Sequence, residues 1–87
     1  MNKTDKPPRL FEYKILYNKP GWLANGEHYY MCLAAEEAVL SHAVVSEQHG
    51  RGLKILAVHK KNPFSNVWED ETMEVSKLIE QHNNKNE

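Results

Sequence analysis

Five histidines and a single cysteine are the side chains of this chain that could bind a metal ion or act as nucleophiles. Zinc sites usually draw their ligands from two closely spaced pairs. His28 and Cys32 have the spacing of one such pair, and the other histidines do not form a second. Cys32 stands among apolar residues, where burial raises the pKa of a thiol and makes it a poor nucleophile. Because the glycine-rich loops that hold nucleotide phosphates are also missing, the sequence predicts a non-enzymatic protein with no metal site, cofactor or catalytic residue.

Basic side chains around the third apolar segment offer a different chemistry, the binding of nucleic acid. Their charged groups would contact phosphates, and tyrosines exposed on a sheet would stack on bases. The basic residues are Arg51, Lys54, Lys60 and Lys61. The tyrosines are Tyr13, Tyr17, Tyr29 and Tyr30. The net charge of −1 weighs against a small RNA- or DNA-binding module, which is therefore the second hypothesis.

Signals for binding a protein are more numerous. Tryptophan is a favoured interface anchor, and Trp22 stands beside Leu23 in a segment rich in turn residues. Leu40 and Val44 form an apolar stripe outside the main face of the expected first helix, so the second helix or a partner must cover them. An acidic patch that would steer the protein towards a basic surface consists of Glu69, Asp70, Glu71 and Glu74. We therefore expect an adaptor or inhibitor that docks on a protein or ribonucleoprotein, with Trp22 folding back onto the core as the alternative.

Hydrophobic periodicity predicts the elements that position these residues. Residues 10–17 and 28–33 alternate between apolar and polar or aromatic side chains, as strands do. Ala, Glu and Leu favour a helix over residues 35–48. A run of apolar and β-branched side chains favours a third strand over residues 53–60.

A second helix is expected over residues 66–82. Asn66 and Glu69 have the spacing of a capping box at its start. Its apolar stripe comprises Trp68, Thr72, Val75, Ile79 and His82. The acidic patch would then lie in the first turns of this helix, where the helix dipole favours negative charge.

The order of these elements predicts an α+β fold of β-β-α-β-α type. We expect a three-stranded, mostly antiparallel sheet with both helices on one face. Strand order 2-1-3 is favoured, and a central third strand is the alternative. The chain divides into a flexible N-terminal arm (1–9), a single domain (10–82) and a disordered polar tail (83–87).

Charge and composition bear on partners and location. Residues 1–61 carry nine Lys or Arg and six Asp or Glu, whereas residues 62–87 carry two and six. This asymmetry favours electrostatic docking or the packing of one half against the other. With one cysteine, no signal peptide and no membrane-spanning apolar run, a cytoplasmic protein is expected, and a homodimer stays open. In size and element order the chain resembles small accessory or inhibitor proteins of phages and mobile elements, a likeness of format alone.

Overall fold

Alternating side chains build β1 (Phe11–Asn18), the strand at the centre of the core. The side chains of Tyr13, Ile15 and Tyr17 are buried on one face of the sheet, and the residues between them are half-buried on the other. This pattern follows from the two-residue period of an extended chain, which sends successive side chains to opposite faces. The sequence therefore located this strand and its buried face correctly.

Three more strands complete an antiparallel sheet in the computed structural model, which describes residues 9–48 and 52–85. They are β2 (Gly26–Cys32), β3 (Lys54–Lys61) and β4 (Trp68–Asp70). The strand order is β2-β1-β3-β4. The favoured order 2-1-3 is confirmed for the first three strands, and β3 is also an inner strand, because β4 pairs along its outer side.

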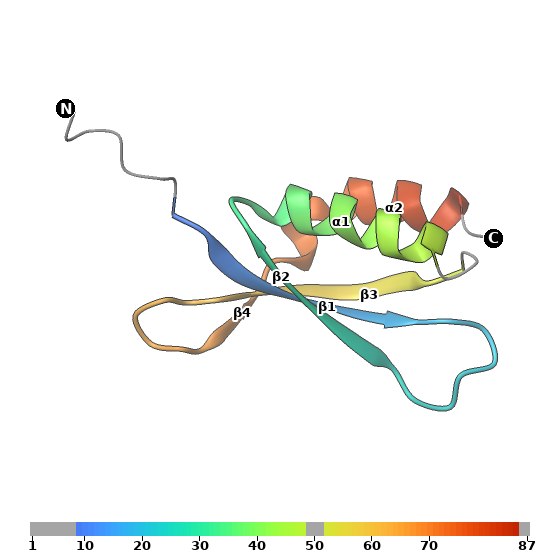
Figure 1. Cartoon of the computed structure of the whole chain (residues 1–87), viewed down its shortest axis with the longest axis horizontal. Coiled ribbons are helices and arrows are strands. Elements are labelled where there is room, and N and C mark those ends of the chain that lie inside the picture. Colours follow the sequence, from blue (N-terminus) through green and yellow to red (C-terminus); the bar gives the residue numbers. More distant parts are fainter. Residues whose placement is uncertain (1–8, 49–51, 86–87) are drawn as a thin grey trace.

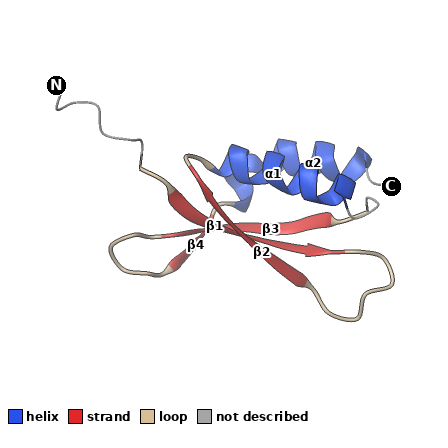
Figure 2. Cartoon of the chain, viewed as in Figure 1, coloured by secondary structure: helices blue, strands red, loops and turns tan. Residues whose placement is uncertain are grey.

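Two helices, α1 (Ala35–Gln48) and α2 (Ser76–Lys85), lie side by side on one face of the sheet (Figures 1 and 2). The buried side of α1 is made largely of small residues, which let the helix approach the strands closely. The residues concerned are Ala35, Ala38, Val39, His42 and Ser46. The α+β class is confirmed, and none of the described helices is long and apolar enough to cross a membrane.

The structure corrects the expected count of three strands and the expected start of the second helix. Trp68 is in β4, paired with Lys61, and does not belong to a helical stripe. Helical structure begins only at the short 3-10 helix η1 (Thr72–Val75), which leads directly into α2. Of the expected stripe, Val75, Ile79 and His82 are buried as predicted.

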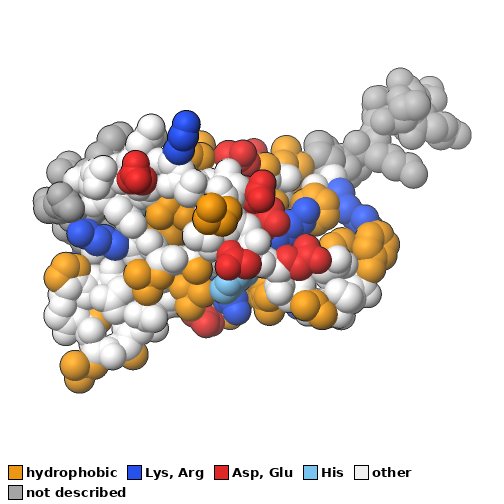
Figure 3. Space-filling view, turned by 180° about the vertical axis from the view of Figure 1, so that it is seen from behind, with side chains coloured by type: hydrophobic (Ala, Val, Ile, Leu, Met, Phe, Trp, Pro, Cys, Tyr) orange, Lys and Arg blue, Asp and Glu red, His pale blue; other side chains and the backbone are white. Residues whose placement is uncertain are grey.

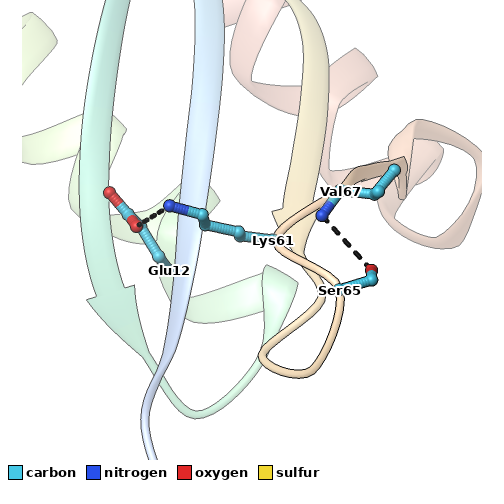
Figure 4. Close-up of polar contacts among 4 residues, drawn as sticks. All are labelled: Glu12, Lys61, Ser65 and Val67. Carbon is cyan, nitrogen blue, oxygen red and sulfur yellow. Dashed lines mark hydrogen bonds and ion pairs between the residues drawn. The ribbon is translucent and has the colours of Figure 1, made fainter.

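Asn62 explains why residues 66–70 do not begin a helix. Its side-chain Oδ1 accepts hydrogen bonds from the backbone N–H groups of Phe64 (2.8 Å) and Ser65 (3.2 Å), which closes the hairpin between β3 and β4. The Ser65 hydroxyl in turn accepts the N–H of Val67 at 3.3 Å (Figure 4). Asn66 has a φ of +61°, a left-handed conformation that a helix N-cap does not adopt. The predicted capping box is therefore wrong.

Side chains from η1 and α2 form hydrogen bonds with the backbone of β3 along the part of this strand that does not pair with β4. The Thr72 hydroxyl accepts the Val58 N–H at 3.1 Å. The Asn83 amide forms two hydrogen bonds with the backbone of Ile55, accepting its N–H at 2.9 Å and donating to its carbonyl at 3.0 Å. The expected end of the second helix at His82 is therefore too early, and α2 continues to Lys85.

Candidate functional site

The loop between β1 and β2 has a defined turn at its start. The N–H of Trp22 donates to the carbonyl of Lys19 at 2.9 Å, and Gly21 has a φ of +94°. Pro20 followed by a glycine with positive φ is the signature of a type II turn. At the base of the loop, the Asn18 amide donates to the side-chain oxygen of Asn25 at 2.9 Å. These contacts fix the direction in which the loop presents its side chains.

Two neighbouring hydrophobic residues project from this loop. One side of the Trp22 ring packs against Tyr17, with ring centroids 5.7 Å apart, yet 44% of the residue stays exposed. Leu23 is fully exposed. Figure 3 shows hydrophobic side chains at the tip of this loop, at the lower left of the molecule. Trp22 is thus both a core contact and a surface residue, where the sequence left the two alternatives open.

A pocket of about 290 Å³ lies beside Trp22. Its lining residues are Tyr17, Lys19, Trp22, His28 and Leu53. The walls are mainly apolar, and three of these five side chains present aromatic rings. The loop, β1, β2 and the residue that precedes β3 therefore meet around one concave site.

Gly26 determines where the Tyr17 ring can lie. A Cβ atom on Gly26 would stand 2.5 Å from the Cζ atom of Tyr17, closer than any ordinary contact. The ring can rest on β2 only because this position carries no side chain. Tyr17 is nearly fully buried, so its ring cannot move aside without disturbing the core.

We expect the substitution Gly26→Ala to lower the free energy of unfolding by about 2 kcal/mol, because overpacking of this size usually costs 1–3 kcal/mol. Urea denaturation followed by circular dichroism measures this change. The matched control is Gly21→Ala, where nothing lies within 4 Å of the new Cβ and only the strain of a positive φ is added. An unfolding free energy of Gly26→Ala within about 0.5 kcal/mol of the wild type would contradict the role assigned to the glycine.

A cluster of three histidines adjoins the pocket. The Nε2 atoms of His42 and His82 lie 2.8 Å and 2.9 Å from the same acceptor, the carbonyl oxygen of Leu53. His28 lies between two tyrosine hydroxyls, each 3.4 Å from one of its ring nitrogens. Burial lowers the pKa of His42 to about 4, even though the bond to Leu53 opposes this shift. His42 is therefore a neutral core residue at physiological pH.

The remaining candidates for metal binding and nucleophilic chemistry are the groups of potential metal ligands and Cys32. Among residues 9–48 and 52–85, no three His, Cys, Asp or Glu side chains are grouped to hold a metal ion. Cys32 is buried at the end of β2, and burial raises the pKa of its thiol. A thiol in this state is a weak nucleophile at neutral pH.

Leu40 and Val44 are exposed on α1, by 60% and 58% respectively. α2 packs beside α1 without covering them, so the alternative in which the second helix shields this stripe is wrong. A two-residue stripe is small, and single exposed apolar residues are common on protein surfaces. These residues remain candidates for partner contact, separate from the pocket.

The acidic patch does not share a surface with Trp22. Glu69 and Asp70 are in β4, while Glu71 precedes η1 and Glu74 is within it. β4 pairs with the Lys61 end of β3, whereas the loop follows Asn18, which pairs with the Lys54 end. The two ends of this eight-residue strand are about 23 Å apart. The acidic patch and Trp22 are therefore at opposite ends of the sheet.

Asp70 has a structural contact of its own. Its carboxylate accepts the N–H of Thr72 at 2.8 Å, and hydrogen bonding from Thr72 lowers the pKa of this carboxyl. Asp70 thus orients the start of η1 from the end of β4.

The basic residues of the second hypothesis are divided between two faces. The ammonium group of Lys60 lies 4.0 Å from the ring centroid of Phe11 on the helix side of the sheet. Lys61 points to the opposite side and forms an ion pair of 3.7 Å with Glu12 (Figure 4). Lys54 is at the other end of β3, and Arg51 lies outside the described residues. The described lysines therefore do not form one basic surface.

Sequence reasoning missed an aromatic group on the sheet face opposite the helices. The rings of Tyr29 and Trp68 are 6.0 Å apart, and the ammonium group of Lys14 lies 4.7 Å from the Trp68 centroid. Tyr29 is exposed, whereas Tyr13 and Tyr17 are buried and Tyr30 is half-buried. Assigning Trp68 to a helix concealed this group, although the alternation of residues 28–33 already placed Tyr29 opposite His28 and Tyr30.

Comparison with known proteins adds no relative: no family model, no curated protein and no solved structure matches this chain.

Proposed function

We propose that this protein is a non-enzymatic adaptor or inhibitor that docks on a protein partner through the loop between β1 and β2. The observation that supports the proposal is the pair Trp22 and Leu23, exposed side by side on a loop whose conformation is held by hydrogen bonds. Exposed hydrophobic side chains lose contact with water when they bind, and a fixed loop loses little conformational entropy in the process. Tryptophan in particular is enriched among the residues that dominate binding energy.

The proposal places the protein in the cytoplasm and assigns the main contact to Leu23, with Trp22 beside it. The acidic patch lies at the far end of the sheet, so its steering of the protein towards a basic surface is a separate, long-range contribution. Leu40 and Val44 would extend the contact along α1 only if the partner reaches beyond the loop.

Single-stranded nucleic acid is the second candidate ligand, and the exposed ring of Tyr29 beside Trp68 and Lys14 favours it. Aromatic side chains on an open sheet are a common platform for unpaired bases. Glu12, Glu27 and Asp70 lie on the same face, however, and their charges oppose phosphate binding. Titration with mixed-sequence RNA and DNA at low salt distinguishes this candidate, since its affinity would fall steeply as salt is added.

We expect Leu23→Ser to weaken docking at least about tenfold without changing the stability of the fold. The probe is a photo-crosslinking residue introduced on the loop at Ala24, an exposed position, with capture from cells that naturally produce the protein. A discrete crosslinked protein should appear with wild-type Leu23 and disappear with Leu23→Ser.

Met73→Ser is the matched control, because Met73 is another strongly exposed hydrophobic residue at the other end of the sheet. It should leave the crosslinked protein unchanged. The proposal fails if Leu23→Ser keeps the product, or if both substitutions remove it equally.

A further inference from the structure

The pocket beside Trp22 has three fixed walls. The ring of Tyr17 lies over Gly26 and is nearly fully buried. The ring of His28 lies 4.8 Å from that of Tyr17 at an angle of 36°. Leu53 is nearly fully buried, and its carbonyl is bound by two histidines from different helices. These walls therefore exist before any ligand arrives.

The other two lining residues, Lys19 and Trp22, belong to the surface loop, and Trp22 presents its ring. Its ring is inclined by 58° to that of Tyr17, and nearly half of the residue is exposed to solvent. The loop lies close to the connection that leads into β3, because a Cβ atom built on Gly52 would stand 3.7 Å from the Lys19 side chain and 4.0 Å from that of Pro20. Trp22 is therefore both a lining residue of the pocket and the chain neighbour of Leu23, the residue that carries the proposed docking contact.

The size of the pocket limits its occupant. An apolar cavity of about 150 Å³ holds a benzene ring, and sites for larger ligands usually exceed about 300 Å³. A volume of about 290 Å³ therefore suits one mono- or bicyclic ring and excludes a nucleotide or a larger cofactor.

The walls also indicate the chemistry of the occupant. The rings of Tyr17, Trp22 and His28 can pack edge to face against another aromatic ring. The Tyr17 hydroxyl and the Nε2 atom of His28, 3.4 Å apart, offer hydrogen bonds at the edge of such a ring. An indole N–H or a phenol O–H satisfies both requirements.

We propose that this pocket receives one aromatic side chain, a tryptophan or tyrosine, of the protein partner. The inference rests on the proposed docking function, because Trp22, which lines the pocket, and Leu23 are consecutive exposed residues of one loop, so a partner that binds Leu23 also lies beside the pocket. The aromatic side chain then packs between Trp22 and His28 and forms a hydrogen bond with the Tyr17 hydroxyl or His28. Leu23 contributes contact area outside the pocket.

The experiment is a titration of the ¹⁵N-labelled full chain with N-acetyltryptophanamide, followed by amide and indole N–H resonances. Ligands of this size bind in the millimolar range at best in a shallow site. We expect saturable shifts of the Trp22 indole resonance and of the amides of Tyr17, His28 and Leu53. The indole resonance of Trp68, on the opposite face, should stay in place.

Two further arms test the chemistry of the ligand. N-acetylleucinamide should bind at least about fivefold more weakly than the tryptophan compound, because it cannot stack or donate from a ring edge. Free indole should bind with an affinity similar to that of N-acetyltryptophanamide. If indole binds and the capped amino acid does not, the pocket is a site for a free small molecule and the proposal is overturned.

A variant pair completes the design. Trp22→Ala removes one wall and should weaken binding at least about tenfold, whereas Phe64→Ala, an exposed aromatic residue on the other hairpin, should not change it. The inference is overturned if the shifts do not saturate at about 10 mM N-acetyltryptophanamide. It is also overturned if the indole resonance of Trp68 shifts as much as that of Trp22. In that case, crosslinking that depends on Leu23 would still support the docking function. In the opposite case, in which the aromatic ligand binds but crosslinking does not depend on Leu23, the docking function alone would be rejected.

Discussion

Asn83→Leu is expected to lower the free energy of unfolding by about 3 kcal/mol, while Asn84→Leu leaves it within about 0.5 kcal/mol of the wild type. The Asn83 amide satisfies both backbone groups of Ile55, at 2.9 Å and 3.0 Å. Leucine removes both partners and leaves a part-buried donor and acceptor without hydrogen bonds. Each such group costs about 1–3 kcal/mol.

The adjacent asparagine provides a close control, since Asn84 is exposed on the same helix and has the same intrinsic helix propensity. Urea denaturation of both variants, monitored by circular dichroism, gives the two free energies. Asn83→Asp adds a second test, because a carboxylate still accepts the Ile55 N–H but places a negatively charged oxygen, in place of the donor, against the Ile55 carbonyl. Equal stabilities of Asn83→Leu and Asn84→Leu would show that the contact contributes nothing measurable.

The same asparagine shows what sequence patterns could and could not predict. Periodicity located β1, β2, α1 and β3, because in these elements burial follows the repeat of the backbone itself. Asn83 comes after the last apolar residue of the second helix and therefore looked like the start of a polar tail. Its role depends on Ile55, which is 28 positions earlier in the chain. A contact of that kind has no local signature.

The fourth strand was missed for a related reason. Trp68, Thr72 and Val75 have the spacing of residues on one face of a helix. From Val75 onwards the helical pattern is correct, because Val75 and Ile79 are buried. What overrides it is the hairpin closed by Asn62, whose N–H donates to the carbonyl of Val67 at 2.8 Å. Pairing with β3 then decides between two patterns that the local sequence fits equally well.

The candidate site was predictable in part. Turn dipeptides around Trp22 and Leu23 indicated a connection between strands but left open whether Trp22 is exposed, and the structure places both residues at the surface. The pocket could not be predicted, because it depends on Gly26 admitting the Tyr17 ring and on Leu53 arriving from a distant segment. The acidic patch was misplaced because it was assigned to a helix that starts later.

The second large effect is a loss of folding stability at acidic pH. We expect the protein to lose about 3 kcal/mol of stability between pH 6.5 and pH 4, on account of His42 alone. Burial lowers the pKa of this histidine from 6.5 to about 4. One pKa unit corresponds to about 1.4 kcal/mol of difference between the two protonation states. A domain of this size has a total stability on the order of 5 kcal/mol, so most of it would be lost at pH 4.

The sign follows from which state binds the proton. Between pH 6.5 and pH 4 the unfolded chain protonates His42, whereas the folded chain keeps it neutral. The stabilising effect of neutrality is therefore complete above pH 6.5 and disappears as the pH falls. Folded His42 resists the proton because its side chain is fully buried, its Nδ1 atom has no hydrogen-bond partner among the described residues, and its ring lies 5.0 Å from that of His82.

His42→Leu separates this effect from the titration of carboxylates, which is common to both proteins. The substitution is structurally tolerable, because His82 still donates to the Leu53 carbonyl that His42 leaves. Urea denaturation at half-unit steps from pH 7.5 to pH 4 should show a steep decline for the wild type and a much flatter curve for the variant. Electrostatic interactions with His82 and His28 also lower the pKa of His42. These interactions are absent from the variant, so the difference between the two curves includes them. Parallel curves for the two proteins would mean that His42 takes up its proton equally well in the folded and unfolded chains, and that the histidine cluster does not make the core sensitive to acid.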